Sequence, residues 1–307
     1  MFRWACLIAI LLAICACLAF PQEYANTAFI LDLGMGARPL ALGEAFTGLA
    51  DDGNALFYNS AGLAWLQDLS ICSSYEARLG TASYGHLSTT LSHFGFGIHY
   101  FDFGEVPETD EFGNILGSFS YRNYAFIAAL GTKAADVPFL SRMPFAEDIG
   151  FGLKAKILKI STLEPGSGTG FSLDLSFLFR SDSPSANIPV ITGCGLGLVI
   201  ENLIGSPIQY GSGHQEPWPK KATAGIAVEL SDQVVLTMDA TNDDCIGLGF
   251  EWTPIPAVSL RNGLKRKGVW MWSSGMGVRY RNFVFDFAVV VHPHLNNQFR
   301  GSLVVLW

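Results

Sequence analysis

The chain has 307 residues, of which 50% are hydrophobic and 15% charged, with a net charge of −8 and a mean hydropathy of +0.31. Beyond residue 20 it has no uninterrupted apolar run of about 18 residues, the least that a membrane helix needs. This composition excludes a helical membrane protein and a disordered chain. It also disfavours a soluble enzyme, and the negative charge argues against a nucleic-acid partner.

The first predicted element is a signal peptide over residues 1–19, which is cleaved. Arg3 gives a positive start, an apolar stretch ends near Leu18, and small residues around Ala19 form a cleavage site. The alternatives are an N-terminal anchor helix and lipidation at Cys15 or Cys17.

Residues 20–69 are predicted to form a plug or hatch segment. Alanine and glycine are frequent between positions 41 and 64, so the backbone can approach a barrel wall closely. Asp51, Asp52, Asn54 and Asn59 can hydrogen-bond to turn backbone and to arginine or lysine side chains of the lumen. The alternative is a short amphipathic helix and turn packed on a soluble β core.

Residues 34–64 also contain a long and unusual motif: Gly36, Ala37, Arg38, Gly43, Ala45, Asp51, Asp52, Asn54, Ala55, Tyr58, Asn59, Ala61, Gly62 and Leu63. This motif resembles the N-terminal stretch of the outer-membrane long-chain fatty-acid transporter superfamily (FadL type), and most closely its PorV-like branch. Ser60 stands where that family usually has proline. The local turn is then less rigid, because serine does not fix φ.

The resemblance implies a barrel whose N-terminal segment folds back into the lumen, gates a hydrophobic passage and lets ligand leave sideways into the membrane. Long-chain fatty acids are the family's example of a ligand, and no cofactor is expected. By resemblance, the hatch consists of Gly36, Ala37, Arg38, Asp51, Asp52, Asn54, Asn59, Ser60, Ala61 and Gly62.

From residue 70 onward the hydrophobicity has a period of two, which is typical of β-strands. In residues 193–200, for example, Cys194, Leu196, Leu198 and Ile200 share one face, and glycines occupy most of the other. Fourteen segments show such a pattern: 70–78, 80–91, 93–104, 117–131, 147–161, 168–180, 190–202, 220–231, 233–242, 245–253, 256–263, 273–281, 283–291 and 298–307.

Strands of this kind fit a soluble sandwich, with apolar faces inward, or a membrane barrel, with apolar faces toward lipid. Long apolar faces, few charges within the strands and aromatic residues at strand ends favour the barrel. The predicted fold is an all-β transmembrane antiparallel barrel of about 14 strands at residues 70–307, with a small helical or coil plug in the lumen. Its predicted location is the bacterial outer membrane, in contact with outer-membrane lipid. The aromatic residues at the strand ends are Phe179, Trp252, Tyr280 and Trp307.

The connections and the end of the chain fit this topology with one exception. The longest connections, 105–116 and 203–219, are predicted outside, and tight turns at 231–234 and 281–283 face the periplasm. The connection 132–146 is long on the periplasmic side, and its apolar residues predict that it lies along the membrane–water boundary. The final strand ends at Trp307, which resembles the signal that barrel-assembly machinery recognises. The alternative is a β protein that simply finishes on a strand.

No catalytic or metal-binding constellation is recognisable in the sequence. Gly166-Ser167-Gly168 lacks the spacing of a nucleophile elbow, and His292 and His294 flank a proline as in a solvated turn. The predicted function is passive uptake of hydrophobic small molecules such as long-chain fatty acids, without enzymatic activity. The alternative is a PorV-like barrel that binds or anchors secreted proteins at the cell surface without transporting small molecules.

Overall fold

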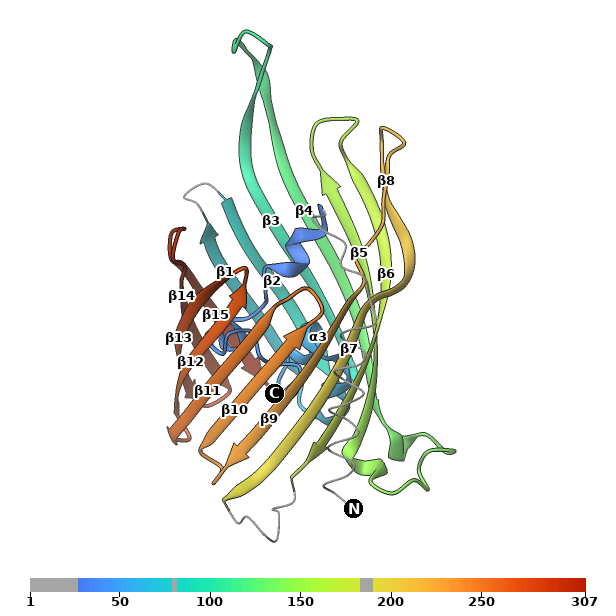
Figure 1. Cartoon of the computed structure of the whole chain (residues 1–307), viewed down its shortest axis with the longest axis vertical. Coiled ribbons are helices and arrows are strands. Elements are labelled where there is room, and N and C mark those ends of the chain that lie inside the picture. The colour runs from blue at the N-terminus through green and yellow to red at the C-terminus, as the bar shows by residue number, and fades with distance from the viewer. Residues whose placement is uncertain (1–26, 79–81, 183–189) are drawn as a thin grey trace.

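The computed structural model describes residues 27–78, 82–182 and 190–307, and the predicted signal peptide lies outside these ranges. Within them, fourteen antiparallel strands form a closed ring, and the two-residue strand β8 (Gln215–Glu216) extends one hairpin (Figure 1). Each strand of the ring pairs with its neighbours in sequence, and the ring closes where the first strand meets the last. The predicted all-β barrel is confirmed.

The ring consists of β1 (Ser70–Arg78), β2 (Ala82–Leu91), β3 (Phe94–Thr109), β4 (Ile115–Lys133), β5 (Ile149–Ser161), β6 (Gly168–Ser181), β7 (Ile191–Tyr210), β9 (Lys221–Leu230), β10 (Val234–Thr241), β11 (Ile246–Ile255), β12 (Val258–Lys267), β13 (Val269–Tyr280), β14 (Phe283–Val291) and β15 (Gln298–Leu306). The short helices are η1 (Thr27–Asp32), α2 (Ala37–Ala41), α3 (Ala55–Tyr58), η2 (Ser60–Trp65), η3 (Ala134–Asp136) and η4 (Ala146–Asp148). In the described part of the chain, no helix is long and apolar enough to cross a membrane.

The two faces of the strands distinguish a barrel from a sandwich. On β6, Phe171 and Leu175 are 38% and 46% exposed, whereas Ser172 and Asp174 between them are buried. The charges of the strands are buried in the same way, on the faces that point into the ring. A dry sandwich core cannot hold so many ions, because each buried ion costs several kcal/mol unless it is paired. The apolar faces therefore point outward to lipid. The buried charged residues are Glu76, Lys154, Lys156, Asp174, Asp239, Glu251, Arg261, Asp286 and Arg300.

Three connections are shorter than the sequence predicts, because strand pairing continues beyond the apolar segments. β3 runs to Thr109 and β4 starts at Ile115, so most of the predicted 105–116 loop is a hairpin that rises far above its neighbours (Figure 1). β7 likewise continues to Tyr210, and Gly268 alone joins β12 to β13. The predictions missed these extensions because polar residues there hide the strand pattern.

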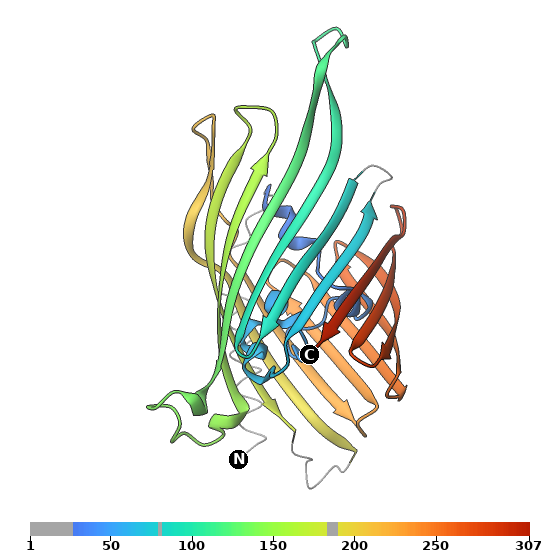
Figure 2. The same ribbon diagram turned by 180° about the vertical axis from the view of Figure 1, so that it is seen from behind.

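The segment before β1 lies inside the ring, as the blue ribbon shows in Figure 1 and, from behind, in Figure 2. We call residues 27–69 the plug. Its apolar side chains pack against the inner wall, with Leu56 and Leu63 near Ile127 and with Phe46 near Ala227. Phe46, Leu56 and Leu63 are fully buried, and each contributes about 1.5–3 kcal/mol relative to an exposed position.

Candidate functional site

An arginine of the plug connects two acidic residues of the same segment to the barrel wall. Arg38 Nη1 lies 2.7 Å from Asp51 and 2.8 Å from Asp52, and Arg38 Nε donates to Glu251 of β11 at 2.9 Å. Burial by itself lowers the pKa of Arg38, but the three carboxylates raise it well above its ordinary value. The arginine therefore stays cationic and holds the plug to the wall.

This arrangement makes one expectation more specific. The sequence predicts that Asp51 and Asp52 bind arginine or lysine of the lumen and turn backbone. The arginine that both bind is Arg38 of their own segment, and Asp52 also accepts from the backbone of Asn54. The wall supplies the carboxylate of Glu251 instead, and Arg261 of β12 binds that carboxylate from the other side. The reason is local: α2 begins after Gly36, whose φ of 72° favours glycine, and Arg38 lies in its first turn.

A second contact joins the end of α3 to β6. Asn59 Nδ2 donates to the carbonyl oxygens of Thr47 at 2.8 Å and Phe177 at 3.0 Å. Ser60 Oγ lies 2.9 Å from Ser176 Oγ, and Ala61 N donates to that same Ser176 oxygen at 3.0 Å. The serine that replaces the usual proline of the motif thus supplies a hydroxyl contact with the wall that proline could not make.

Glycines of β7 let the plug backbone lie directly on the wall, as the sequence predicted. A Cβ atom at Gly195 would meet the carbonyl oxygen of Gly48 at 2.1 Å, and one at Gly197 would meet that of Thr47 at 2.1 Å. Larger side chains at either position are incompatible with this docking.

The remaining motif residues stabilise the plug from within or bind β15. Asn54 donates through its backbone and side-chain nitrogens to Asp52 Oδ1, both at 2.8 Å. Ala37 N donates to Ser302 Oγ of β15 at 2.7 Å. A Cβ atom at Gly62 would lie 2.1 Å from the carbonyl oxygen of Ala50. The ten predicted residues therefore lie together in the lumen, in two groups around Arg38 and Asn59.

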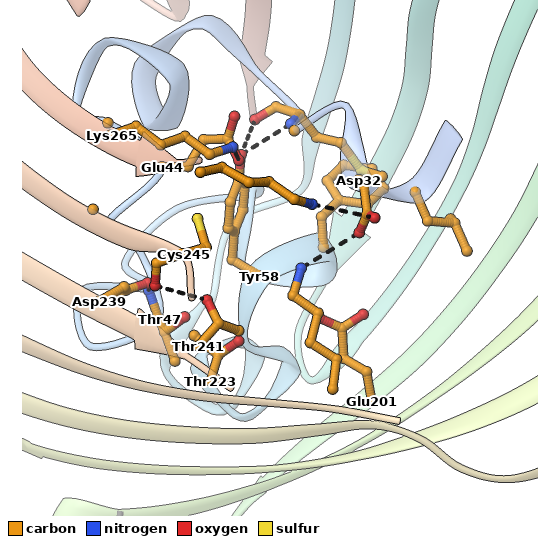
Figure 3. A pocket seen from close by; sticks show the side chains of 18 of the residues that line it. Asp32, Glu44, Thr47, Tyr58, Glu201, Thr223, Asp239, Thr241, Cys245 and Lys265 are labelled. Atoms are coloured by element: carbon orange, nitrogen blue, oxygen red, sulfur yellow. Dashed lines mark hydrogen bonds and ion pairs between the residues drawn. The ribbon is translucent and has the colours of Figure 1, made fainter. Parts of the chain in front are cut away.

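A polar cavity of about 90 Å³ lies between the plug and the wall on the side of the long hairpins (Figure 3). Glu44 of the plug binds Lys265 of β12 at 2.6 Å. Asp32 at the end of η1 lies 3.4 Å from Lys221 and 3.6 Å from Lys267. Burial by itself raises the pKa of Glu44, but the ammonium of Lys265 outweighs it and lowers that pKa. These ion pairs join the plug to β9 and β12 on this side.

A larger cavity of about 700 Å³ lies below the plug, at the end where the tight turns are. Arg38 and Glu251 form part of its lining, with Trp65 of η2 and Cys72 of β1. The two cavities share no lining residue, and plug residues line both, so the plug lies between them.

A third hollow, of about 500 Å³, lies on the lipid-facing surface of β1 to β6 and is almost wholly apolar. Its floor includes Gly97 and Ile127, and Ile127 also borders the cavity above the plug. On the inner side, a Cβ atom at Gly97 would lie 3.1 Å from the ring of Phe57. The wall is therefore thin where the plug and the outer hollow face each other.

The barrel residues that hold the plug were not among the predicted site residues. Those that form ion pairs with it are Glu251, Lys265, Lys221 and Lys267, and Arg261 supports Glu251. The sequence indicates only that Glu251 faces the lumen, because it shares the inner face of β11 with Gly247 and Gly249. Within the three described ranges, no group of histidine, cysteine or acidic side chains is placed to hold a metal ion.

Comparison with known proteins shows a likeness in fold. No family model matches the sequence, and no curated protein matches it. Among solved structures, the Pseudomonas putida toluene transporter TodX aligns with a TM-score of 0.54 and 11% identity, over 89% of this chain and 96% of TodX. The monoaromatic hydrocarbon channel CymD gives 0.55 and 13%, over 92% and 98%. A Pseudomonas aeruginosa FadL homologue gives 0.52 and 11%, over 94% and 99%.

These likenesses cover about nine tenths of this chain and almost the whole of each similar chain. The similar structures are channels and not enzymes, and none of them supports the PorV-like branch. A closed barrel with an apolar outer face is the form in which β proteins span the bacterial outer membrane, which agrees with the predicted location. The chain therefore has the fold of the FadL-type outer-membrane channels.

Proposed function

We propose that the protein lets small hydrophobic molecules cross the outer membrane passively, through a barrel that the plug opens and closes. The observation that carries this proposal is the plug itself: it separates two cavities of the lumen and is held at its charged positions by Arg38, Glu44 and Asp32. The fold shared with TodX, CymD and a FadL homologue supports it. The comparisons give no support to the alternative role in binding or anchoring secreted proteins.

Ion pairs make the plug a reversible closure. An ion pair can exchange one partner for another of the same charge, and water hydrates the separated groups. A ligand with a carboxylate, such as a long-chain fatty acid, would meet Lys265 and Lys267 beside the upper cavity and compete there with Glu44 and Asp32. Such competition weakens the contact of the plug with β12.

The apolar part of a ligand needs a route that avoids the charged lumen. The outer hollow lies across a thin wall from Phe57, with Gly97 between them. The strands β2, β3 and β4 are continuously paired at this level. A sideways exit, as the FadL resemblance implies, therefore requires the pairing of these strands to open there as well as Phe57 to move with the plug.

A reversible disulfide between plug and wall tests the proposal. Ser60 Oγ and Ser176 Oγ are 2.9 Å apart, so cysteines at both positions bring their sulfur atoms within bonding reach. The chain carries Ser60→Cys and Ser176→Cys, with Cys72, Cys194 and Cys245 replaced by serine. Uptake of radiolabelled toluene and of oleate is measured in cells that make the barrel and in cells that lack it.

We expect uptake above that of cells lacking the barrel, loss of this excess on oxidation, and recovery with a reducing agent. Ser60→Cys alone, which cannot form the bond, should not respond to the oxidant. The two labelled compounds separate fatty acids from monoaromatic hydrocarbons as substrates. Uptake of neither compound above the level of cells without the barrel would rule out the transport function.

A further inference from the structure

The connection between β4 and β5 is unlike the other described connections on its side of the barrel. Residues 92–93, 231–233, 256–257 and 281–282 are tight turns, whereas residues 134–148 form an ordered loop with the two short helices η3 and η4. The loop extends sideways beyond the wall of the barrel in both Figure 1 and Figure 2. It therefore does not cover the lumen.

The outermost side chains of this loop are apolar and project into the surroundings. Phe139 is 80% exposed, Phe145 57% and Met143 48%, and the two prolines that flank this stretch, Pro138 and Pro144, are exposed as well. An apolar cluster of this kind on a membrane protein marks a contact with lipid or with another protein.

The backbone of the loop satisfies many of its own hydrogen bonds. Leu140 N and Ser141 N both donate to the carbonyl oxygen of Val137 at 2.9 Å, and Met143 N donates to that of Leu140 at 2.9 Å. Ser141 Oγ donates to the carbonyl oxygen of Pro138 at 3.0 Å. Polar backbone groups that are already paired can enter a region poor in water at a low cost.

Most charged groups lie at the base of the loop, and the exposed Arg142 is the one charged residue of its tip. Lys133 lies 3.7 Å from Glu147, and its ammonium lies over the ring of Trp65, 5.8 Å from the ring centre. Just above this base the lipid-facing side of the barrel begins, where Phe151 and Leu153 of β5 are 38% and 44% exposed. The apolar tip therefore continues the surface that already faces lipid.

Aromatic side chains mark the level of the membrane interface at this end of the barrel. Tyr280 ends β13, Trp307 follows β15 directly and Trp252 lies near the end of β11, and they are 63%, 61% and 41% exposed. Aromatic belts of this kind are found at the interface between the apolar core and the headgroups. The 134–148 loop leaves the barrel at this same end.

We propose that residues 137–145 insert into the phospholipid leaflet on the periplasmic side and act as an interfacial membrane anchor of the barrel. Phe139, Met143 and Phe145 bury their side chains near the acyl chains, as in other interfacial segments. The guanidinium of Arg142 reaches back to the headgroups, and the ion pair at the base stays among them. This inference rests only on the barrel spanning the membrane and is independent of what the barrel transports.

Nitroxide labels report whether the tip lies in lipid or in water. The full mature chain, with Cys72, Cys194 and Cys245 replaced by alanine, carries a single label at Phe139→Cys or Met143→Cys in phosphatidylethanolamine and phosphatidylglycerol vesicles. Phe287→Cys on β14, 47% exposed on the lipid face, is the lipid control. Phe112→Cys at the tip of the long β3–β4 hairpin, 81% exposed, is the water control.

We expect labels at positions 139 and 143 to collide with oxygen several-fold more often than with a water-soluble nickel chelate. The label at Phe287→Cys should give the same result, and the label at Phe112→Cys should give the opposite one. Phe139→Asp should bring the label at position 143 into water, and Phe139→Leu should leave it in lipid. A label at position 139 that is as open to nickel as the hairpin control would overturn the proposal. So would shielding from both reagents, which would place the loop against a second copy of the chain.

Discussion

Arg38 and Glu251 face each other through two parallel hydrogen bonds, from Nε to Oε2 and from Nη2 to Oε1, each 2.9 Å long. The two residues are 213 positions apart in sequence, so the pair joins the plug to a strand of the far part of the barrel. Bidentate pairs of arginine and carboxylate fix orientation as well as distance. The plug is thus held in one defined pose.

Removing this arginine should release the lower part of the plug. Arg38→Ala leaves the half-buried Asp51 and Asp52 without their cation and removes the two hydrogen bonds to Glu251. The loss of a hydrogen bond to a charged group costs about 1.5–3 kcal/mol. We expect higher ion conductance in planar bilayers and faster proteolysis between residues 38 and 52, with the barrel still folded. Arg279→Ala is the matched control, because Arg279 lines the same cavity and makes no ion pair in the described part of the chain. Wild-type conductance in Arg38→Ala would show that the arginine does not hold the plug.

Adding a side chain under the plug should displace it as well. In Gly197→Val the new Cβ would meet a backbone carbonyl, which cannot rotate away as a side chain can. We expect residues 47 and 48 to leave the wall, which hydrogen exchange followed by mass spectrometry measures as faster exchange. Gly301→Val on β15 is the control, since nothing lies within 4 Å of a Cβ atom there. Equal exchange in the two variants would contradict the close docking.

Acidification should loosen the upper part of the plug through Glu44. Its folded pKa is lower than the ordinary value of 4.5, so the ion pair with Lys265 contributes stability above pH 4.5. That stability is lost as the pH falls through the lower folded value. We expect exchange of the amides around residue 44 to increase in this acidic range. Glu44→Gln should remove the acidic step, and Glu111→Gln on the exposed hairpin should keep it. An unchanged acidic step in Glu44→Gln would assign it to another group.

The last residue should matter for assembly and not for stability. Trp307 is 61% exposed and its backbone N–H donates to the carbonyl oxygen of Leu69 at 2.9 Å. We expect Trp307→Ala to lower the folded fraction in cells, measured by the mobility of unboiled protein on gels, while refolding in detergent stays normal. Trp270→Ala, which removes a similarly exposed tryptophan of β13 at the other end of the barrel, should assemble as the wild type. Normal assembly of Trp307→Ala would exclude a recognition signal at this residue.

The barrel could be predicted from the sequence because lipid on one side and the lumen on the other impose a period of two. On β6, for example, Phe171 and Leu175 are exposed on the outer face, and Ser172 and Asp174 are buried on the inner face. This period is absent where β3 and β4 extend beyond the bilayer. Glu105 and Ser120 pair there through their main chains, and such pairing needs no apolar face. The partners of the plug could not be predicted either. The contact of Arg38 with Glu251 depends on which barrel strand lies next to Arg38 in the folded protein, and the strand pattern does not specify that.

The contacts of Arg300 have a consequence for how the ring and the plug depend on each other. This arginine of β15 donates to Glu76 of β1 and to the carbonyl oxygens of Leu33 and Gly34. It is 224 positions from Glu76, and 266 and 267 positions from Gly34 and Leu33. One side chain therefore binds both the strand that closes the ring and the segment inside it, so ring closure and plug docking stabilise each other.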